Sequence, residues 1–358
     1  MKTAIITFQD AINYGAVLQA YALKTTLNKY SECDVINYYN DFFHRKSENK
    51  SIKSMIVCLL NKKNKKEKEK KFNRFLDNYI ISSSNIYDDN NLKSLNDQYD
   101  LFVTGSDQVW NFKCSGNKKS YFLDFVDSRA KKASYAASFG SNQIENKEIV
   151  RKLLSDFLYI SVRENSGREI LNDIYGKEYP VVLDPTLLIT KEEWKKQFDL
   201  SESEKYVLVY EVLNGQEILS LAKQYAEEHN FHLKYITSSN KPQVGVECIK
   251  NAGPEEWLDL ISNSAFIFTN SFHGLAFSLI FNKQFAIELL PPPANTNARL
   301  IELLEKVGLE NRIIKNSIIP EKLIDFSTVN TELKILRDQS IGYIKTMVGV
   351  KENEGKSK

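Results

Sequence analysis

A repeated order of segments constrains the fold of this chain more than any other feature of its sequence. Short apolar runs end in small or polar residues, and a segment with helical character follows at once. The clearest example is the apolar run 266–268, which is followed by polar residues at 269–271 and 273, by Gly274 and by a predicted helix over 275–281. Alternating strands and helices are typical of α/β proteins with parallel sheets. The polar residues then lie at the carboxyl ends of strands, where open α/β sheets bind ligands.

The same unit recurs along both halves of the chain. A chain of 358 residues exceeds what one ordinary core accommodates. We therefore expect an α/β protein of two doubly wound Rossmann-like domains that face each other across a cleft. The expected domains cover 1–188 and 189–330, with a basic insertion near 44–71, a closing helix at 331–347 and a disordered tail at 348–358. The predicted strands cover 4–8, 35–38, 100–104, 132–139, 158–162 and 181–183 in the first half, and 206–213, 232–237, 266–268 and 284–290 in the second.

The bulk composition narrows the classes of function. The formal net charge is +2, which gives no reason to expect a nucleic-acid partner. The four cysteines lie far apart and predict neither a disulfide framework nor a zinc site, which fits a reducing compartment. The sequence shows no signal peptide or membrane span, so we expect a cytoplasmic location. The basic run 62–71 indicates either solvated lysines or a patch for an anionic membrane surface, which would place the protein at the inner face of the membrane.

Unusual polar residues follow the predicted strands in both halves. His273 can act as a general acid or base near neutral pH, and arginines bind carboxylate or phosphate through paired hydrogen bonds. A small substrate with two anionic groups therefore suits this cleft better than an apolar one. The sequence contains no P-loop, no G-x-S-x-G elbow and no metal-binding cluster, so no metal site is expected. We expect Arg163, Asn270, Ser271, Gly274 and Arg299 to bind the anionic groups of this substrate, and Asn13, Gly15, Gly105, Ser106, Asp107 and Gln108 to line the cleft.

These residues also have structural interpretations. His273 could be a satisfied core histidine, and Asp107 could cap a helix. Arg163 could form a salt bridge between domains, and Arg299 could be a solvated residue at the start of a helix. The residues alone leave these alternatives open.

Five segments of the sequence stand out together, namely Asn13-Tyr-Gly-Ala-Val-Leu-Gln-Ala-Tyr-Ala-Leu23, Gly105-Ser-Asp-Gln-Val-Trp-Asn111, Ser161-Val-Arg-Glu164, Leu183-Asp-Pro-Thr186 and Ser271-Phe-His-Gly274. In this order, they resemble the polysaccharide pyruvyl transferase family. The resemblance extends from about residue 3 to about residue 315. It implies a two-domain fold similar to that of the GT-B glycosyltransferases, and no cofactor besides the donor substrate.

The activity that this resemblance implies is transfer of pyruvate, as a cyclic ketal, from phosphoenolpyruvate to two hydroxyls of a sugar. The implied acceptor is a surface glycan or a lipid-linked oligosaccharide on the side of the first domain, and the donor binds on the side of the second. The resemblance makes His273 the general acid and Arg163 a donor ligand. Some family members carry an arginine where this chain has Ser271 and a lysine beyond the histidine, where Arg299 is the nearest cation. A GT-B glycosyltransferase that uses a nucleotide sugar, or a binding protein without catalysis, are the alternatives.

Overall fold

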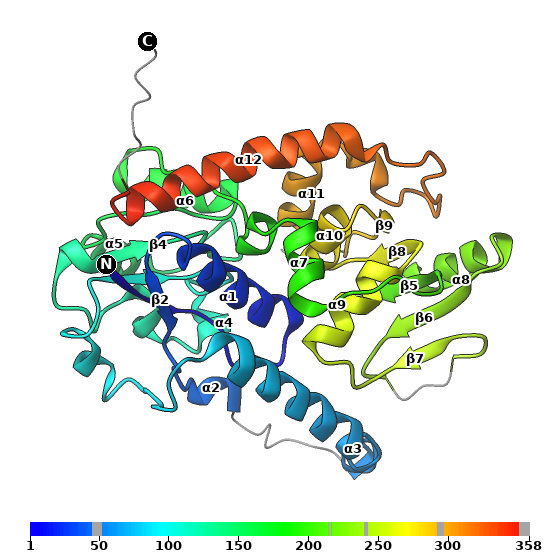
Figure 1. Cartoon of the computed structure of the whole chain (residues 1–358), viewed down its shortest axis with the longest axis horizontal. Helices are drawn as coiled ribbons and strands as arrows, with labels where there is room; N and C mark the ends of the chain where they lie inside the picture. Colours follow the sequence, from blue (N-terminus) through cyan, green and yellow to red (C-terminus); the bar gives the residue numbers. More distant parts are fainter. Residues whose placement is uncertain (45–51, 214, 216, 240–242, 292–296, 351–358) are drawn as a thin grey trace.

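Two parallel β-sheets form the framework of the protein in its computed structural model (Figure 1). The structure describes residues 1–44, 52–213, 215, 217–239, 243–291 and 297–350. All strand pairs in both sheets run parallel, which confirms the predicted α/β class. The first sheet has the order β2-β1-β3-β4, with β1 (Lys2–Ile6), β2 (Glu32–Val35), β3 (Leu101–Thr104) and β4 (Lys132–Ser134). The second has the order β7-β6-β5-β8-β9, with β5 (Tyr206–Tyr210), β6 (His232–Ile236), β7 (Glu247–Ile249), β8 (Phe266–Thr269) and β9 (Gln284–Ile287).

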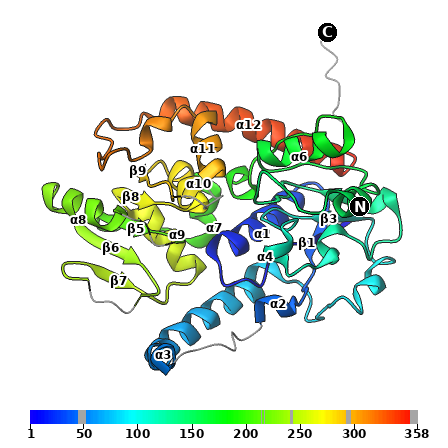
Figure 2. The same cartoon turned by 180° about the vertical axis from the view of Figure 1, so that it is seen from behind.

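Helices connect the strands and surround both sheets (Figures 1 and 2). Those nearest the site are α1 (Tyr14–Leu27), α9 (Pro254–Asn263), α10 (Phe272–Ile280) and α11 (Asn297–Lys306). The others are α2 (Asp41–His44), α3 (Ile52–Phe75), α4 (Phe112–Ser115), α5 (Lys147–Leu154), α6 (Asn165–Tyr175), α7 (Lys191–Phe198), α8 (Ile218–Glu228) and α12 (Phe326–Met347). A π-helical turn covers Leu76–Ile80, and 3₁₀ turns cover Leu92–Leu95, Lys119–Phe122, Arg129–Lys131, Pro185–Leu188 and Glu310–Arg312.

Neighbouring residues of each strand face different apolar layers. In β8, Phe266 and Phe268 pack into one core, whereas Ile267 packs into another. In β3, Phe102 and Val103 are divided in the same way. Both faces of each sheet are therefore covered, as parallel sheets require. The core that contains Ile267 also contains Val103, so the two sheets share it; we call it the shared core.

α12 ties the end of the chain to the first sheet. Figure 1 shows it running along one side of the molecule, past both sheets, and Figure 2 shows the same from behind. The Tyr343 hydroxyl donates to the carbonyl of Ser134 at 3.0 Å, and Ser340 Oγ accepts the backbone N–H of Leu183 at 3.0 Å. The predicted closing helix is thus present.

The start of α12 differs from the predicted one. The helix begins at Phe326 rather than at 331, because the side chain of Asp325 caps it by accepting the backbone N–H of Ser327 at 2.9 Å. Of the predicted tail, residues 351–358 lie outside the described residues.

The edges of the sheets also differ from the prediction. The positive φ of Ala136, 51°, turns the chain soon after β4, so the predicted strand 132–139 ends early. The predicted strands 158–162 and 181–183 contribute isolated parallel bridges instead of full strands. In the second sheet, β7 forms an edge strand that sequence patterning missed, because none of its residues is buried.

α3 occupies most of the segment that we expected to be a basic insertion; residues 45–51 lie outside the described residues. Lys66 is exposed, as predicted for solvated lysines. Two other lysines face the protein: Lys71 pairs with Glu256 at 2.7 Å, and Lys68 Nζ lies 4.5 Å from the ring centroid of Tyr14. Membrane contact through the exposed lysines stays a prediction. Within the described ranges, no helix is both long enough and apolar enough to cross a membrane.

Candidate active site

The candidate site lies where the carboxyl edges of the two sheets meet. β1 and β3 are neighbours in the first sheet, and β5 and β8 are neighbours in the second, although neither pair is consecutive in the chain. At such switch points the connections leave toward opposite sides, and ligands bind between them. The loop after β1 and the loop after β8 contribute Gly15 and His273, which are in contact.

The turn between β8 and α10 fixes the position of the histidine. Ser271 caps α10, because its Oγ accepts the backbone N–H of Gly274 at 3.3 Å. Gly274 is required there, since a Cβ at this position would lie 2.3 Å from Thr269 Oγ1. Ser271 and Gly274 were both expected to bind the donor. In this cap, the Ser271 hydroxyl and the Gly274 N–H bind each other. His273 follows in the first turn of α10.

The imidazole of His273 lies between a glycine and a carboxylate that both belong to the first half of the chain. A Cβ at Gly15 would be 2.0 Å from His273 Nδ1, so the ring packs directly on the backbone of α1. On its other edge, Nε2 lies 3.7 Å from Asp184 Oδ2. The side chain is 12% exposed, and its Nε2 has no hydrogen-bond partner in the described structure. The ring is therefore held in place with a carboxylate beside it that can stabilise positive charge during proton transfer.

Asp184 is fully buried, and its carboxylate contacts Ser106, Arg163 and His273, which together with it we call the cluster. Its Oδ2 accepts from the Ser106 hydroxyl at 3.1 Å and from Arg163 Nη1 at 3.0 Å. Its Oδ1 accepts the backbone N–H and the hydroxyl of Thr186 at 3.0 and 2.7 Å. Burial alone would raise the pKa of this carboxyl, but the neighbouring His273 and Arg163, with the hydrogen bond from Thr186, lower it well below its ordinary value. Asp184 is therefore ionised at neutral pH.

Arg163 is a buried cation among three carboxylates. Its Nη1 lies 3.0 Å from Asp184 Oδ2, its Nε 3.4 Å from Glu164 Oε2 and its Nη2 3.9 Å from Asp107 Oδ1. Burial would lower the pKa of the guanidinium, but these carboxylates raise it above the ordinary value. Nη2 makes no hydrogen bond to the described part of the chain, so it can donate to a ligand.

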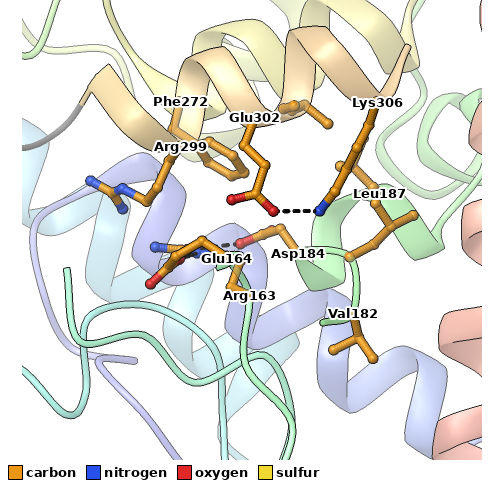
Figure 3. A pocket seen from close by; sticks show the side chains of 11 residues that line it. Arg163, Glu164, Val182, Asp184, Leu187, Phe272, Arg299, Glu302 and Lys306 are labelled. Atoms are coloured by element: carbon orange, nitrogen blue, oxygen red, sulfur yellow. Dashed lines mark hydrogen bonds and ion pairs between the residues drawn. The ribbon is translucent and has the colours of Figure 1, made fainter. Parts of the chain in front are cut away.

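A pocket opens beside this cluster, along α11 (Figure 3). The guanidinium carbons of Arg163 and Arg299 lie 5.1 and 5.9 Å from the ring centroid of Phe272. Burial and the nearby charge of Arg163 lower the pKa of Arg299. Among the described residues, Arg299 has no carboxylate at ion-pair distance, and its Nε has no hydrogen-bond partner. The pocket is lined by Arg163, Glu164, Val182, Leu183, Asp184, Leu187, Phe272, Arg299, Glu302, Leu303 and Lys306.

Comparison with known protein families assigns the chain to one of them. The family model described as polysaccharide pyruvyl transferase matches residues 13–287, which include Arg163, Asp184 and His273. The chain belongs to this family. It is therefore a transferase of the polysaccharide pyruvyl transferase kind, as the sequence resemblance predicted. No curated protein sequence matches the chain.

Solved structures share the fold. A putative UDP-N-acetylglucosamine 2-epimerase from Listeria monocytogenes matches with a TM-score of 0.50 and 11% identity, over 96% of this chain and 90% of that one. The UDP-GlcNAc 2-epimerase of Methanocaldococcus jannaschii, in complex with UDP-GlcNAc and UDP, has a TM-score of 0.46, 16% identity and coverage of 94% and 99%. The heptosyltransferase WaaC of E. coli with ADP has a TM-score of 0.43, 10% identity and coverage of 95% and 100%. The first match, with the two parallel sheets, confirms the two-domain Rossmann-like, GT-B-like fold.

The loop after β3 brings two residues that we predicted to line the cleft to the cluster. Ser106 binds Asp184, and Asp107 approaches Arg163. The helix-cap alternative for Asp107 is wrong, since Asn111 caps α4. Asp107 instead has a positive φ of 77°, which a non-glycine residue adopts at a cost. Gly105 and Gln108 flank this turn: a Cβ at Gly105 would lie 3.1 Å from the nearest side chain, and Gln108 accepts from Asn111 at 3.2 Å.

Asn13 and Asn270 bind backbone groups of the transferase outside the cluster. Asn13 Oδ1 accepts the N–H of Ala16 at 3.2 Å and caps α1. Asn270 is buried, where it accepts the N–H of Val212 at 2.9 Å and donates to the carbonyl of Leu213 at 2.8 Å. Ligand binding by either side chain stays a prediction.

From the sequence we did not select five charged or aromatic residues that line the pocket. Asp184 directly follows the predicted strand 181–183, so the strand-end rule could have found it. Glu164 and Phe272 are each next to a selected residue, but their types gave no separate signal. Glu302 and Lys306 lie on one face of α11 and pair at 2.8 Å, which only the packing of α11 reveals. The described part of the chain contains no group of three or more His, Cys, Asp or Glu residues placed to hold a metal ion.

Proposed function

We propose that this transferase moves pyruvate from phosphoenolpyruvate to two hydroxyls of a sugar in a surface polysaccharide or its lipid-linked precursor, forming a cyclic ketal and releasing phosphate. The observation that carries the proposal is a pair of guanidinium groups, those of the buried Arg163 and the half-buried Arg299, next to the histidine–carboxylate pair of His273 and Asp184. Each guanidinium has an N–H group without a hydrogen-bond partner in the described structure. Two such cations suit a donor with one carboxylate and one phosphate.

Arg299 is the cation that gains most from a bound anion. Arg163 already has Asp184 and Glu164 beside it, whereas Arg299 has no carboxylate at ion-pair distance in the described part of the chain. A dianionic donor in the pocket would give Arg299 a partner and accept the remaining N–H of Arg163. The ring of Phe272, which both guanidinium groups approach, offers a flat apolar surface for the planar enol of the donor.

The reaction needs a proton on the methylene carbon of phosphoenolpyruvate. In this proposal His273 donates that proton, and C2 becomes an oxocarbenium-like centre. One sugar hydroxyl then adds to C2 and returns its proton to His273. Phosphate leaves, the second hydroxyl adds to the same carbon, and its proton departs with the phosphate. Asp184 stabilises the charged imidazole, and Gly15 fixes the orientation of the ring.

The donor contacts both halves of the chain in this arrangement. Arg163 and Asp184 precede residue 189, and His273 and Arg299 follow it. Donor binding is therefore shared between the expected domains instead of being confined to the second.

The test is release of phosphate from phosphoenolpyruvate together with a ketal on the glycan. The purified protein is incubated with phosphoenolpyruvate and fragments of bacterial surface glycans. The mass of each glycan is then measured by mass spectrometry. We expect one phosphate released per ketal formed, loss of both in His273→Gln, and no change in His232→Gln, whose side chain is 80% exposed. Turnover of a nucleotide sugar without any consumption of phosphoenolpyruvate would overturn the proposal in favour of a glycosyltransferase.

A further inference from the structure

A second pocket lies at the carboxyl edge of the second sheet, next to the candidate active site. It is formed by the ends of β5, β6 and β7, by the loop before α1, and by Lys68 of α3. Asn13 and Tyr14 line it, and the next residue, Gly15, supports the ring of His273. A ligand in this pocket would therefore extend toward the reacting histidine along the start of α1.

Lys68 is a cation without an anionic partner in this pocket. Its Nζ lies 4.5 and 5.6 Å from the ring centroids of Tyr14 and Phe72, and none of the described carboxylates is at ion-pair distance. Lys71, one turn further along α3, differs because it pairs with Glu256 at 2.7 Å. Burial lowers the pKa of Lys68, and no carboxylate offsets this effect. A bound anion would supply the missing partner.

The other groups of the pocket are compatible with a sugar that carries such an anion. Glu211 is the negatively charged residue of the lining. Its Oε2 accepts the N–H of Gly215 at 2.7 Å and its Oε1 accepts the Tyr235 hydroxyl, so both carboxylate oxygens are hydrogen-bonded within the protein. Lys250 adds a second positive charge. Three apolar side chains of the lining are about half exposed, namely Ile12, Val212 and Leu213.

We propose that this pocket binds a phosphate or diphosphate group attached to the acceptor sugar, with Lys68 as its principal ligand. The inference rests on the proposed pyruvyl transfer, because that reaction is what defines an acceptor. The sugar would then lie beside Asn13, with its hydroxyls directed toward His273. A lipid-linked sugar and a nucleotide-linked sugar both carry this phosphate chemistry, and the experiment separates them.

The decisive variant is Lys68→Met, which removes the charge and retains an apolar stem over Tyr14. The matched control is Lys66→Met, an exposed lysine on the same helix, and Lys68→Arg is the rescue. Binding of pyrophosphate, UDP and geranyl diphosphate is measured by calorimetry. We expect Lys68→Met to weaken binding by roughly 10- to 100-fold, as for loss of a charge-assisted hydrogen bond. The control should bind as the wild type does, and Lys68→Arg should restore most of the affinity.

The three probes identify the source of the phosphate. Tighter binding of geranyl diphosphate than of pyrophosphate supports a lipid-linked acceptor, and tighter binding of UDP supports a nucleotide-linked one. Equal affinity of wild type and Lys68→Met for all three probes overturns the inference.

Kinetics separate this inference from the proposed function. Phosphoenolpyruvate turnover with an unchanged KM for a phosphorylated acceptor in Lys68→Met overturns the pocket assignment and leaves pyruvyl transfer intact. Lys68-dependent binding of the probes, without turnover of phosphoenolpyruvate on any acceptor, supports the pocket and refutes the proposed reaction. The KM for phosphoenolpyruvate should be the same in wild type and variant.

Discussion

At the scale of single residues, Gly15 at the start of α1 predicts that some group approaches the backbone closely, but its sequence context does not say which group. The structure shows that the approaching group is the imidazole of His273, which no local pattern indicates. Asp184 then completes the arrangement from a third segment. In the proposed reaction, the orientation of the His273 ring therefore depends on Gly15, which acts through its backbone contact with the ring.

Gly15→Ala tests this dependence. Its Cβ would lie 2.0 Å from His273 Nδ1, so the ring must move. We expect kcat to fall about 10²-fold, as for a misplacement of about 1 Å, with little change in the KM for phosphoenolpyruvate. Gly342→Ala is the control, because a Cβ there meets nothing within 4 Å. Equal activity of both variants would contradict the role of Gly15.

The carboxyl of Asp184 makes stability depend on pH. Its pKa in the folded protein is far below the 3.8 of an ordinary aspartate, so its contribution is present above about pH 4 and is lost as the pH falls further. Asp184→Asn should therefore lower the free energy of unfolding by about 3 kcal/mol at neutral pH, since it leaves buried partners unpaired. Urea titrations at several pH values should show this difference shrinking only below about pH 4. A difference that vanished near neutral pH would contradict the assignment.

The two arginines should respond differently to the same change. Arg163→Met leaves Asp184 and Glu164 without their cation, so we expect a loss of about 3 kcal/mol in unfolding free energy. Arg299→Met removes a half-buried charge that has no carboxylate partner in the described structure, so stability should be unchanged or higher. It should nevertheless raise the KM for phosphoenolpyruvate by roughly 10- to 100-fold. Steady-state kinetics and chemical denaturation check both expectations. A large loss of stability in Arg299→Met would contradict the inference that Arg299 lacks a carboxylate partner.

At the scale of elements, the central strands were predictable and the sheet edges were not. The central strands β1, β3, β5 and β8 are buried apolar runs, so their sequences indicate them clearly. β7 is partly exposed and lacks that pattern. The inward lysines of α3 were also beyond prediction, because Lys68 and Lys71 resemble their exposed neighbours until the folded chain brings Tyr14 of α1 beside Lys68 and Glu256 of α9 beside Lys71.

The cap of α10 gives a prediction at this scale. Ser271→Ala removes the acceptor for the N–H of Gly274 and should cost about 1 kcal/mol of stability. Because α10 carries His273, the same change should also lower kcat. Asp325→Ala, which removes the cap of α12, is the matched control and should lower stability without lowering kcat. If the two variants had equal kcat, α10 would not position the histidine through its cap.

At the scale of the whole molecule, the shared core makes the two halves depend on each other. Trp257 is fully buried there, with its ring centroid 5.3 Å from that of Tyr14 in the first half. Sequence patterning predicted apolar residues in each half, but a core common to both sheets results from their docking and has no local signature.

Trp257→Ala should therefore destabilise both sheets together. We expect a loss of about 3–5 kcal/mol and a single unfolding transition. Hydrogen exchange should show faster exchange in β1 and in β8 alike. Leu323→Ala, at a side chain that is 69% exposed, is the control and should change little. Faster exchange confined to β8 would show that the sheets unfold separately.

The return of α12 to the first sheet sets an order of events during synthesis. Tyr343 and Ser340 bind Ser134 and Leu183, so the first half acquires these partners only after α12 has left the ribosome. Domains generally fold from the N-terminus as they emerge. Here the surface beside residues 134 and 183 waits for a helix that is made more than 140 residues later. A factor that shields nascent chains would meet this surface until α12 emerges.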